Sequence, residues 1–170
     1  MALLEACAGQ GLGDVSVAEV VQRAGVGRAT FYLHYPSLEE LAVDACADVV
    51  REAVDALHAW RGTPNPDAPP LPLEAFFAGL EQHRGVYTPL VAPGGGGPLG
   101  RVLHRDLRER SRTERELAGA PEAELVAAAV AGTFTGVLAD WLHGLVPGTP
   151  TDVAGRVWRL LIALHRAPLG

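Results

Sequence analysis

The segment "SVAEVVQRAGVGRATFYLHYPSLEEL", residues 16–41, decides the fold of this 170-residue chain. It holds two short helical stretches on either side of a glycine-containing turn, and a proline closes the second stretch. Ser16 and Glu19 have the spacing of a capping box, in which each side chain accepts a hydrogen bond from the other residue's backbone amide. Gly25 tolerates the left-handed backbone in which many helices end. The pattern predicts a helix over residues 17–24, a turn, and a second short helix.

The same capping chemistry recurs at the far end of the segment. Ser37 and Glu40 have the same spacing, and apolar residues then recur every three or four positions for about twenty residues. This period predicts one long helix. Residues 62–72, "GTPNPDAPPLP", contain five prolines and cannot continue that helix, so we expect a linker there.

Four more helices are predicted further along, over about residues 72–90, 99–117 and 121–144 and from residue 149 onward. The arginines of the second of these share one face, where nearby carboxylates favour a solvent-exposed, salt-bridged surface over an anion-binding stripe. The third is apolar almost all round. Its uncharged run is shorter than the roughly twenty residues that span a membrane, so we expect a buried helix.

The glycine-rich stretch "APGGGGPLG", residues 92–100, separates two of these helices. A phosphate-binding loop would need a preceding strand and a following lysine, and the stretch has neither. We therefore expect a flexible connection between helices.

The fold class predicted from these patterns is all-α. The chain is 48% hydrophobic and 20% charged, strong helix formers outweigh β-branched runs, and no stretch shows the alternation of a half-buried strand. We expect an amino-terminal helix-turn-helix module of three helices over residues 1–47, with a short first helix. A helical ligand-binding and dimerisation domain is expected over residues 48–170.

All 14 basic residues are arginine, and the absence of lysine excludes several catalytic templates. A Schiff-base lysine, a phosphate-loop lysine and a serine–lysine nucleophile pair are all impossible. The histidines show no metal-ligand spacing, so we expect no catalytic residue, no metal and no cofactor, and an enzyme is the least favoured hypothesis. Cys7 and Cys46 are isolated thiols, and no signal peptide or membrane anchor is predicted, so the expected location is cytoplasmic.

The two short helices around Gly25 have the spacing of a helix-turn-helix, whose second helix enters the DNA major groove. Arg28 and Thr30 would lie at the groove-facing start of that helix, and polar-tipped aromatic side chains further along would donate to phosphates. Phe31 is expected to point inward. The alternative is that all the rings of this cluster simply pack in a core, as aromatic side chains often do.

The quoted segment resembles the amino-terminal DNA-binding region of the tetracycline-repressor (TetR) family. The resemblance continues back through "LLEACAGQG", residues 3–11, which is similar to the end of that family's first helix. The later segments "HRGVYTPLV" and "VAGTFTGVLADWLHG" are similar to the carboxyl-terminal region of some members. The resemblance implies an all-helical homodimer, in most cases a repressor, that binds double-stranded operator DNA and releases it when a small-molecule effector enters the second domain.

The resemblance also implies, position by position, which residues meet DNA. The start of the second helix and the recognition helix carry them, followed by a group that contacts the DNA backbone. The implied DNA-binding residues are Ser16, Val17, Arg28, Ala29, Thr30, Tyr32, Leu33, His34 and Tyr35.

The second domain should hold an effector pocket, which needs a mostly apolar lining and a few polar anchors. The residues predicted to supply it are Phe76, Phe77, Leu80, His83, Tyr87, Leu103, Leu107, Phe134, Leu138 and Trp141. A homodimer face is expected on the last two helices, because they carry more large apolar side chains than a short helix pair can bury alone. Its predicted residues are Gly132, Gly136, Trp141, Leu142, Leu145, Trp158, Leu161 and Leu164.

Three features support a second hypothesis, a helical ligand-binding dimer with a degenerate DNA reader that no longer binds DNA. Leu38 stands where the TetR family usually has a lysine that meets a phosphate. The first helix is short, and no basic arm leads into it. Residues 1–45 contain two arginines against six carboxylates, whereas DNA binding draws much of its affinity from cationic side chains.

Overall fold

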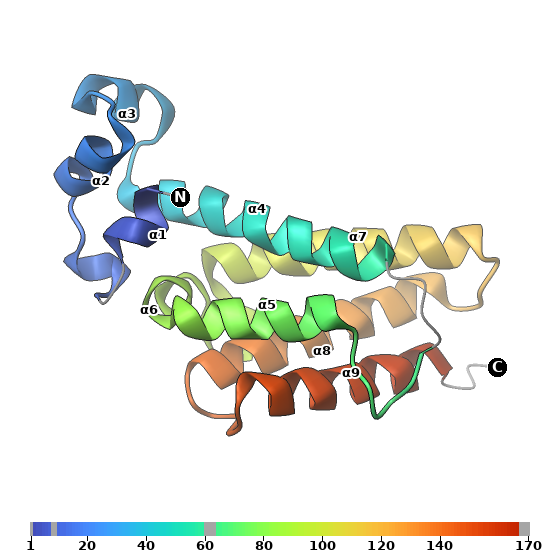
Figure 1. The fold of residues 1–170 in the computed structure, drawn as a ribbon. Helices are drawn as coiled ribbons and strands as arrows, with labels where there is room; N and C mark the ends of the chain where they lie inside the picture. Colours follow the sequence, from blue (N-terminus) through green and yellow to red (C-terminus); the bar gives the residue numbers. More distant parts are fainter. Residues whose placement is uncertain (1, 8–9, 60–63, 167–170) are drawn as a thin grey trace.

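The structure is a computed structural model that describes residues 2–7, 10–59 and 64–166, and its described elements are helical (Figure 1). The α-helices are α1 (Ala2–Ala6), α2 (Val17–Ala24), α3 (Arg28–His34), α4 (Leu38–Ala59), α5 (Leu71–Gln82), α6 (Arg84–Tyr87), α7 (Gly97–Leu117), α8 (Ala123–Leu142) and α9 (Pro150–Arg166). Three short 3₁₀ turns are η1 (Leu12–Asp14), η2 (Thr88–Leu90) and η3 (Pro93–Gly95). The all-α prediction is confirmed.

The local signals around α2 act as predicted, and at the start of α4 the Ser37 hydroxyl accepts a hydrogen bond from the Glu40 amide at 3.1 Å, which is one half of the predicted capping box. The Ser16 hydroxyl accepts a hydrogen bond from the Glu19 amide at 3.3 Å, and the Ser16 amide donates to Glu19 Oε2 at 2.8 Å, which closes the capping box at the start of α2. Gly25 ends α2 with φ of 67°, a left-handed conformation that costs glycine little. The turn therefore fixes α3 across α2, as a helix-turn-helix requires.

The long helix α4 connects the helix-turn-helix with the rest of the molecule. It runs for 22 residues, about 33 Å, from Leu38 beside α3 to Ala59. In Figure 1 its first turns lie next to α1 and its later turns lie along α7. The predicted boundary after residue 47 falls inside this helix, so the two expected domains share one continuous element.

The body of the protein is formed by α4, α5, α7, α8 and α9, with α8 packed against both α7 and α9. Helix α8 contributes ten buried residues, among them Phe134 and Trp141. By length and composition alone α8 is apolar enough to cross a membrane, with a mean hydropathy of 1.6, yet 56% of that window is buried inside the protein. The prediction of a buried helix is confirmed.

The exposed face of α7 is salt-bridged, as its alternating charges predict. Arg108 pairs with Glu124 of α8, Arg112 pairs with Glu116 at 3.0 Å, and Arg110 reaches Asp55 of α4. Pairs of this exposure add little stability individually. They tie α7 to both neighbouring helices.

The glycine-rich stretch differs from its prediction, because it is packed closely against α8 instead of forming a flexible connection. Gly94 donates its amide to Asp140 Oδ1 at 2.8 Å. Gly95 and Gly97 have φ of 90° and 83°, and a β-carbon on either would come within about 3 Å of backbone atoms. Gly136 of α8 faces this loop, with the Gly94 carbonyl oxygen 3.9 Å from where its own β-carbon would be. The glycines therefore allow the loop backbone to pack closely against α8.

Candidate nucleic-acid interface and ligand cavity

The second helix of the helix-turn-helix, α3, presents most of its surface to solvent. Phe31 is its buried residue, at 6% exposure, and it packs edge-on against the Tyr32 ring at a centroid distance of 5.1 Å. Tyr32 and Leu33 are 56% and 79% exposed. Phe31 therefore points inward, as expected, and the other rings of the cluster are not core residues.

The structure places the predicted DNA-binding residues on one continuous segment set apart from the helical body, at the upper left of Figure 1. Six of the nine are on α3 and are exposed to solvent; these are Arg28, Ala29, Thr30, Tyr32, Leu33 and His34. Ser16 is exposed at the start of α2, where its hydroxyl is already bonded to Glu19. Val17 beside it is half-buried. Their contact with DNA stays a prediction.

Tyr35, an expected phosphate donor, has its hydroxyl engaged within the protein. Its hydroxyl donates to Asp44 Oδ2 on α4 at 2.8 Å, so the single phenolic proton is already used. This hydrogen bond raises the pKa of Tyr35, because the neutral phenol is the form that donates. In this conformation Tyr35 fastens the end of α3 to α4.

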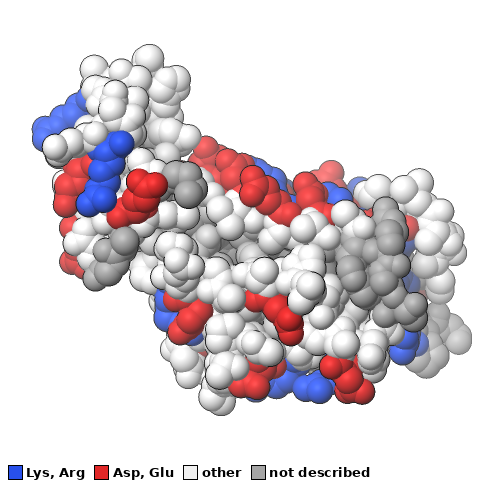
Figure 2. Space-filling view, in the orientation of Figure 1, with Lys and Arg blue, Asp and Glu red and all other residues white. Residues whose placement is uncertain are grey.

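The charge around this surface is mostly negative. The guanidinium of Arg23 donates to the Glu5 carbonyl at 3.3 Å and is held against the first helix. Arg28 lies at the start of α3. Carboxylates recur along α4 in its first three turns, at Glu40, Asp44 and Asp48. In the view of Figure 2 these turns carry acidic side chains, and the end that holds α2 and α3 shows few basic ones.

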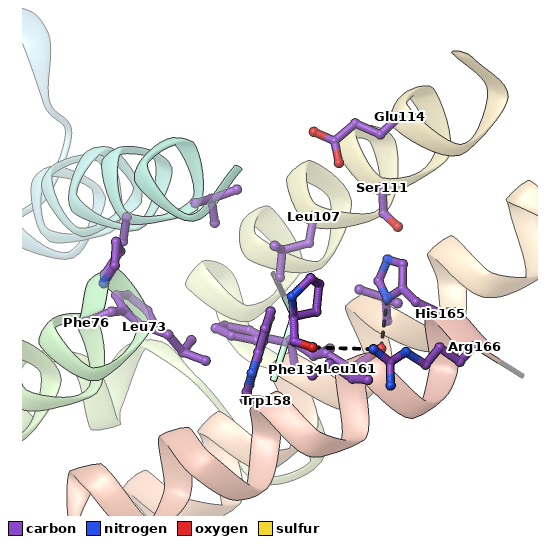
Figure 3. A pocket seen from close by; sticks show the side chains of 16 residues that line it. Leu73, Phe76, Leu107, Ser111, Glu114, Phe134, Trp158, Leu161, His165 and Arg166 are labelled. Atoms are coloured by element: carbon purple, nitrogen blue, oxygen red, sulfur yellow. Dashed lines mark hydrogen bonds between the residues drawn. The ribbon is translucent and has the colours of Figure 1, made fainter. Parts of the chain in front are cut away.

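A second site is an apolar, partly open cavity of about 380 Å³ lined by residues of α4, α5, α7, α8 and α9 (Figure 3). Phe76 of α5 and Phe134 of α8 form one wall, with their rings stacked at a centroid distance of 5.9 Å. Trp158 of α9 forms another, and its indole Nε1 donates to the Asn65 carbonyl at 2.7 Å. Ala53 and Val54 bring α4 to the same cavity.

Polar groups lie at one end of the cavity, on α7 and on the last turn of α9. They are Ser111, Glu114, His165 and Arg166 (Figure 3). Ser111 is 6% exposed, and its hydroxyl has no hydrogen-bond partner. An apolar cavity with a few polar groups at one end is the usual form of a small-molecule site.

Three of the ten predicted pocket residues line this cavity, namely Phe76, Leu107 and Phe134. Six others are buried in the core away from it, because their sides of the helices face neighbouring helices; these are Phe77, Leu80, Tyr87, Leu103, Leu138 and Trp141. His83 is half-buried at the end of α5.

Sequence reasoning missed the polar end of the cavity. Ser111 and His165 each lie four positions after a cavity-lining leucine, Leu107 and Leu161, and so share a helix face with it. A polar residue at that spacing on an otherwise apolar face was the available signal. Among the described residues, no three His, Cys, Asp or Glu side chains are grouped so as to hold a metal ion.

The predicted dimer face is only partly available on the surface. Four of its eight residues are buried within the protomer, because α8 and α9 turn them toward the core and the cavity; these are Trp141, Leu142, Trp158 and Leu161. Gly136 is covered by the glycine-rich loop. Gly132 and Leu145 are exposed, and Leu164 is half-buried.

This geometry defines a helix-turn-helix protein. Its helix-turn-helix, α2 and α3, is joined by α4 to a helical body that contains a cavity. Residues 2–45 match the model of a family described as "Bacterial regulatory proteins, tetR family". The match covers the helix-turn-helix end of the chain, which is thus similar to the amino-terminal domain of the tetR family.

Solved structures share the fold over nearly the whole chain. A TetR transcriptional regulator from Rhodococcus sp. RHA1 aligns with a TM-score of 0.64 and 22% identity, covering 99% of this chain and 93% of the other. A structure of RolR (NCGL1110) without ligand aligns with a TM-score of 0.59 and 19% identity, covering 94% and 89%. No curated protein matches the chain. At these identities the structural likeness shows the fold alone.

Proposed function

We propose that the chain is a one-component transcriptional regulator of the TetR type, which binds operator DNA as a homodimer and is released by a small molecule. Residues 1–47 form the DNA-binding domain and residues 48–170 the ligand-binding and dimerisation domain. One observation carries the proposal: α4 begins beside the recognition helix α3, and its Ala53 and Val54 line the cavity. DNA reader and cavity therefore share a continuous helix.

The mechanism is a shift between two conformations. A dimer reads two half-sites about 34–36 Å apart, so its two α3 helices must keep that spacing. A molecule in the cavity contacts α4 directly and favours the conformation in which α4 has moved. The ligand lowers operator affinity to the extent that it binds this conformation better than the DNA-competent one.

The dimer interface is proposed on the outer faces of α8 and α9. Leu125 and Gly132 of α8 are exposed, and Leu160 of α9 is 46% exposed. A twofold interface brings the same patch of both protomers together, so these residues would meet their counterparts. Gly132 has open space around its α-carbon, which allows a close approach by another helix.

The proposal is tested by fluorescence anisotropy with duplex DNA from the intergenic regions that flank the gene, titrated at two stated salt concentrations. We expect the protein to bind one of these duplexes at least about 10³-fold more tightly than a scrambled duplex. Arg28→Ala should weaken this binding and lower its salt dependence, whereas Arg112→Ala, in an exposed ion pair of α7 outside the proposed dimer interface, should change neither. Equal affinity for specific and scrambled duplexes contradicts the proposal.

The second candidate, a ligand-binding dimer with a degenerate reader, is favoured by the acidic amino-terminal domain and by the bond between Tyr35 and Asp44. Leu38→Lys separates the two, since it puts a cation at the start of α4 where TetR proteins usually have one. In a working reader this variant should bind the duplex more tightly and with a steeper salt dependence. If neither the wild type nor the variant shows specific binding, the degenerate reader is the better description.

A further inference from the structure

We infer that the cavity takes a compact, neutral molecule with an apolar, ring-shaped body and one hydroxyl group, which is bound by Ser111. The inference rests on the proposed ligand-sensing function and names the chemistry that the site selects. The cavity of about 380 Å³ lies at the small end of the roughly 300–1,000 Å³ typical of ligand sites. Phe76, Phe134 and Trp158 line it, so flat apolar bodies suit its walls.

The hydroxyl of Ser111 is the observation that points to a ligand oxygen. Serines inside helices usually donate to the carbonyl four residues earlier or turn outward to water. Ser111 does neither: its side chain is buried on the cavity side of α7, and its oxygen has no partner. Buried polar groups are rarely left unsatisfied, and those that are need a specific explanation. A bound oxygen atom would accept the proton that Ser111 offers.

The neighbouring groups specify a donor as well as an acceptor on the ligand. His165 Nδ1 lies 2.8 Å from the Leu161 carbonyl, which can only accept, so Nδ1 carries the proton. In the neutral ring Nε2 is then an acceptor. Ser111 and His165 lie at the same end of the cavity in Figure 3. A hydroxyl group satisfies both, because it accepts from Ser111 and donates to His165.

The charges at this end favour a neutral guest. Glu114 lines the cavity with a carboxylate, and Arg166 lines it with a guanidinium that donates to the Pro64 carbonyl at 3.4 Å. One carboxylate and one guanidinium give this end of the cavity no net formal charge. An anionic ligand therefore gains no net attraction there, and it has no proton to donate to the Nε2 of a neutral His165 ring.

The test uses three probes of one shape, 2-naphthol, 2-methylnaphthalene and 2-naphthoate, in calorimetric titrations of the full chain. We expect 2-naphthol to bind the wild type, and Ser111→Ala to weaken it about tenfold while changing 2-methylnaphthalene less than about twofold. Thr113→Ala is the matched control, because Thr113 lies on the same helix, is exposed and bonds the Glu109 carbonyl. It should leave all affinities unchanged.

Folding of the variants is checked by thermal melting. Ser111→Ala removes an unsatisfied hydroxyl and should not lower the melting temperature. Ser111→Cys, which keeps a similar volume and hydrogen-bonds weakly, provides a second variant with the same expected loss for 2-naphthol.

Three outcomes overturn the inference: no binding of 2-naphthol to the wild type, tighter binding of 2-naphthoate than of 2-naphthol, or a 2-naphthol affinity that does not depend on Ser111. These titrations contain no DNA. Ser111-dependent affinity therefore supports the inference even where operator binding fails, and operator binding without that dependence contradicts the inference alone.

Discussion

At the scale of single residues, the helix-turn-helix contrasts an anchor with an exposed face. Phe31 is 6% exposed and Leu33, two positions along α3, is 79% exposed. Neighbouring positions of one short helix thus differ almost completely in burial. The stability of the helix-turn-helix depends on the buried Phe31 side chain, whereas its surface chemistry depends on exposed positions such as Leu33.

Phe31→Ala should lower the free energy of unfolding by about 3–5 kcal/mol, because it leaves a cavity under α3. Leu33→Ala, with an apolar side chain already in water, should change it by less than about 0.5 kcal/mol. Urea denaturation followed by circular dichroism measures both. Equal effects of the two substitutions would contradict the packing described for α3.

The two cysteines illustrate burial acting on chemical reactivity. Cys7 and Cys46 are both buried thiols. Burial raises the pKa of Cys46 to about 12, and it raises the pKa of Cys7 as well. The thiolate, which is the reactive form, is therefore scarce at neutral pH.

Native protein at pH 8 should react with a thiol-specific disulfide reagent only slowly, at a rate set by opening of the structure. In guanidinium chloride both thiols should react at once, since unfolding restores their ordinary pKa near 8.5. Absorbance of the released thiolate records both phases. A rapid native reaction of one equivalent or more would show that a cysteine is exposed.

At the scale of elements, the caps of α2 and α9 make stability depend on pH. Hydrogen bonds from the Ser16 amide and hydroxyl lower the pKa of Glu19, and those from the Thr149 hydroxyl and amide lower the pKa of Asp152. A carboxylate whose pKa is lower in the folded state stabilises the fold above its unfolded-state pKa. That contribution disappears as the pH falls through the folded-state pKa.

Glu19→Gln should therefore lower the melting temperature at pH 7 and have a smaller effect near pH 3, where the wild-type carboxylate is largely protonated. Asp152→Asn should follow the same pattern at the other end of the chain. Glu116→Gln, in an exposed ion pair of α7, is the control and should change little at either pH. A decrease that is as large at pH 3 as at pH 7 would mean that the caps do not act through their charge.

The glycine-rich loop makes a second prediction at this scale. Gly97→Ala should destabilise the protein by about 2 kcal/mol or more, because its φ is 83° and a β-carbon would lie 2.8 Å from the Leu90 carbonyl oxygen. Gly79→Ala, inside α5 with nothing within 4 Å, should stabilise it by about 0.5–1 kcal/mol. Denaturant titrations distinguish the signs. If Gly97→Ala left the free energy of unfolding unchanged, the glycine-rich loop would be the flexible connection that the sequence alone predicts.

At the scale of the whole molecule, sequence patterns predicted the elements better than their contacts. The capping boxes, Gly25 and the apolar period of α4 are local signals, and α2, α3 and α4 lie where those signals place them. Which face of a helix meets which neighbour depends on packing distant in sequence. For this reason Trp158 and Leu161 line the cavity instead of extending an outer surface.

The packing of the glycine-rich loop had no local signal either. Its glycines are typical of a free connection, and only the approach of α8 shows what they are for. The polar end of the cavity had no local signal for a related reason, since Ser111 and Arg166 are far apart in sequence and line the same cavity only in the folded protein. Local chemistry predicts where helices begin and end, and tertiary packing decides what they enclose.

The unbroken course of α4 makes it a lever. Ala53 and Leu38 are fifteen residues apart, which is about 22 Å along the helix axis. If the cavity end acts as the fulcrum, a tilt of about 5° there carries the start of the helix sideways by about 2 Å. In a dimer related by a twofold axis, the displacements of the two α4 helices would add. A small bound molecule would then change the separation of the two recognition helices by several ångströms without unfolding any element.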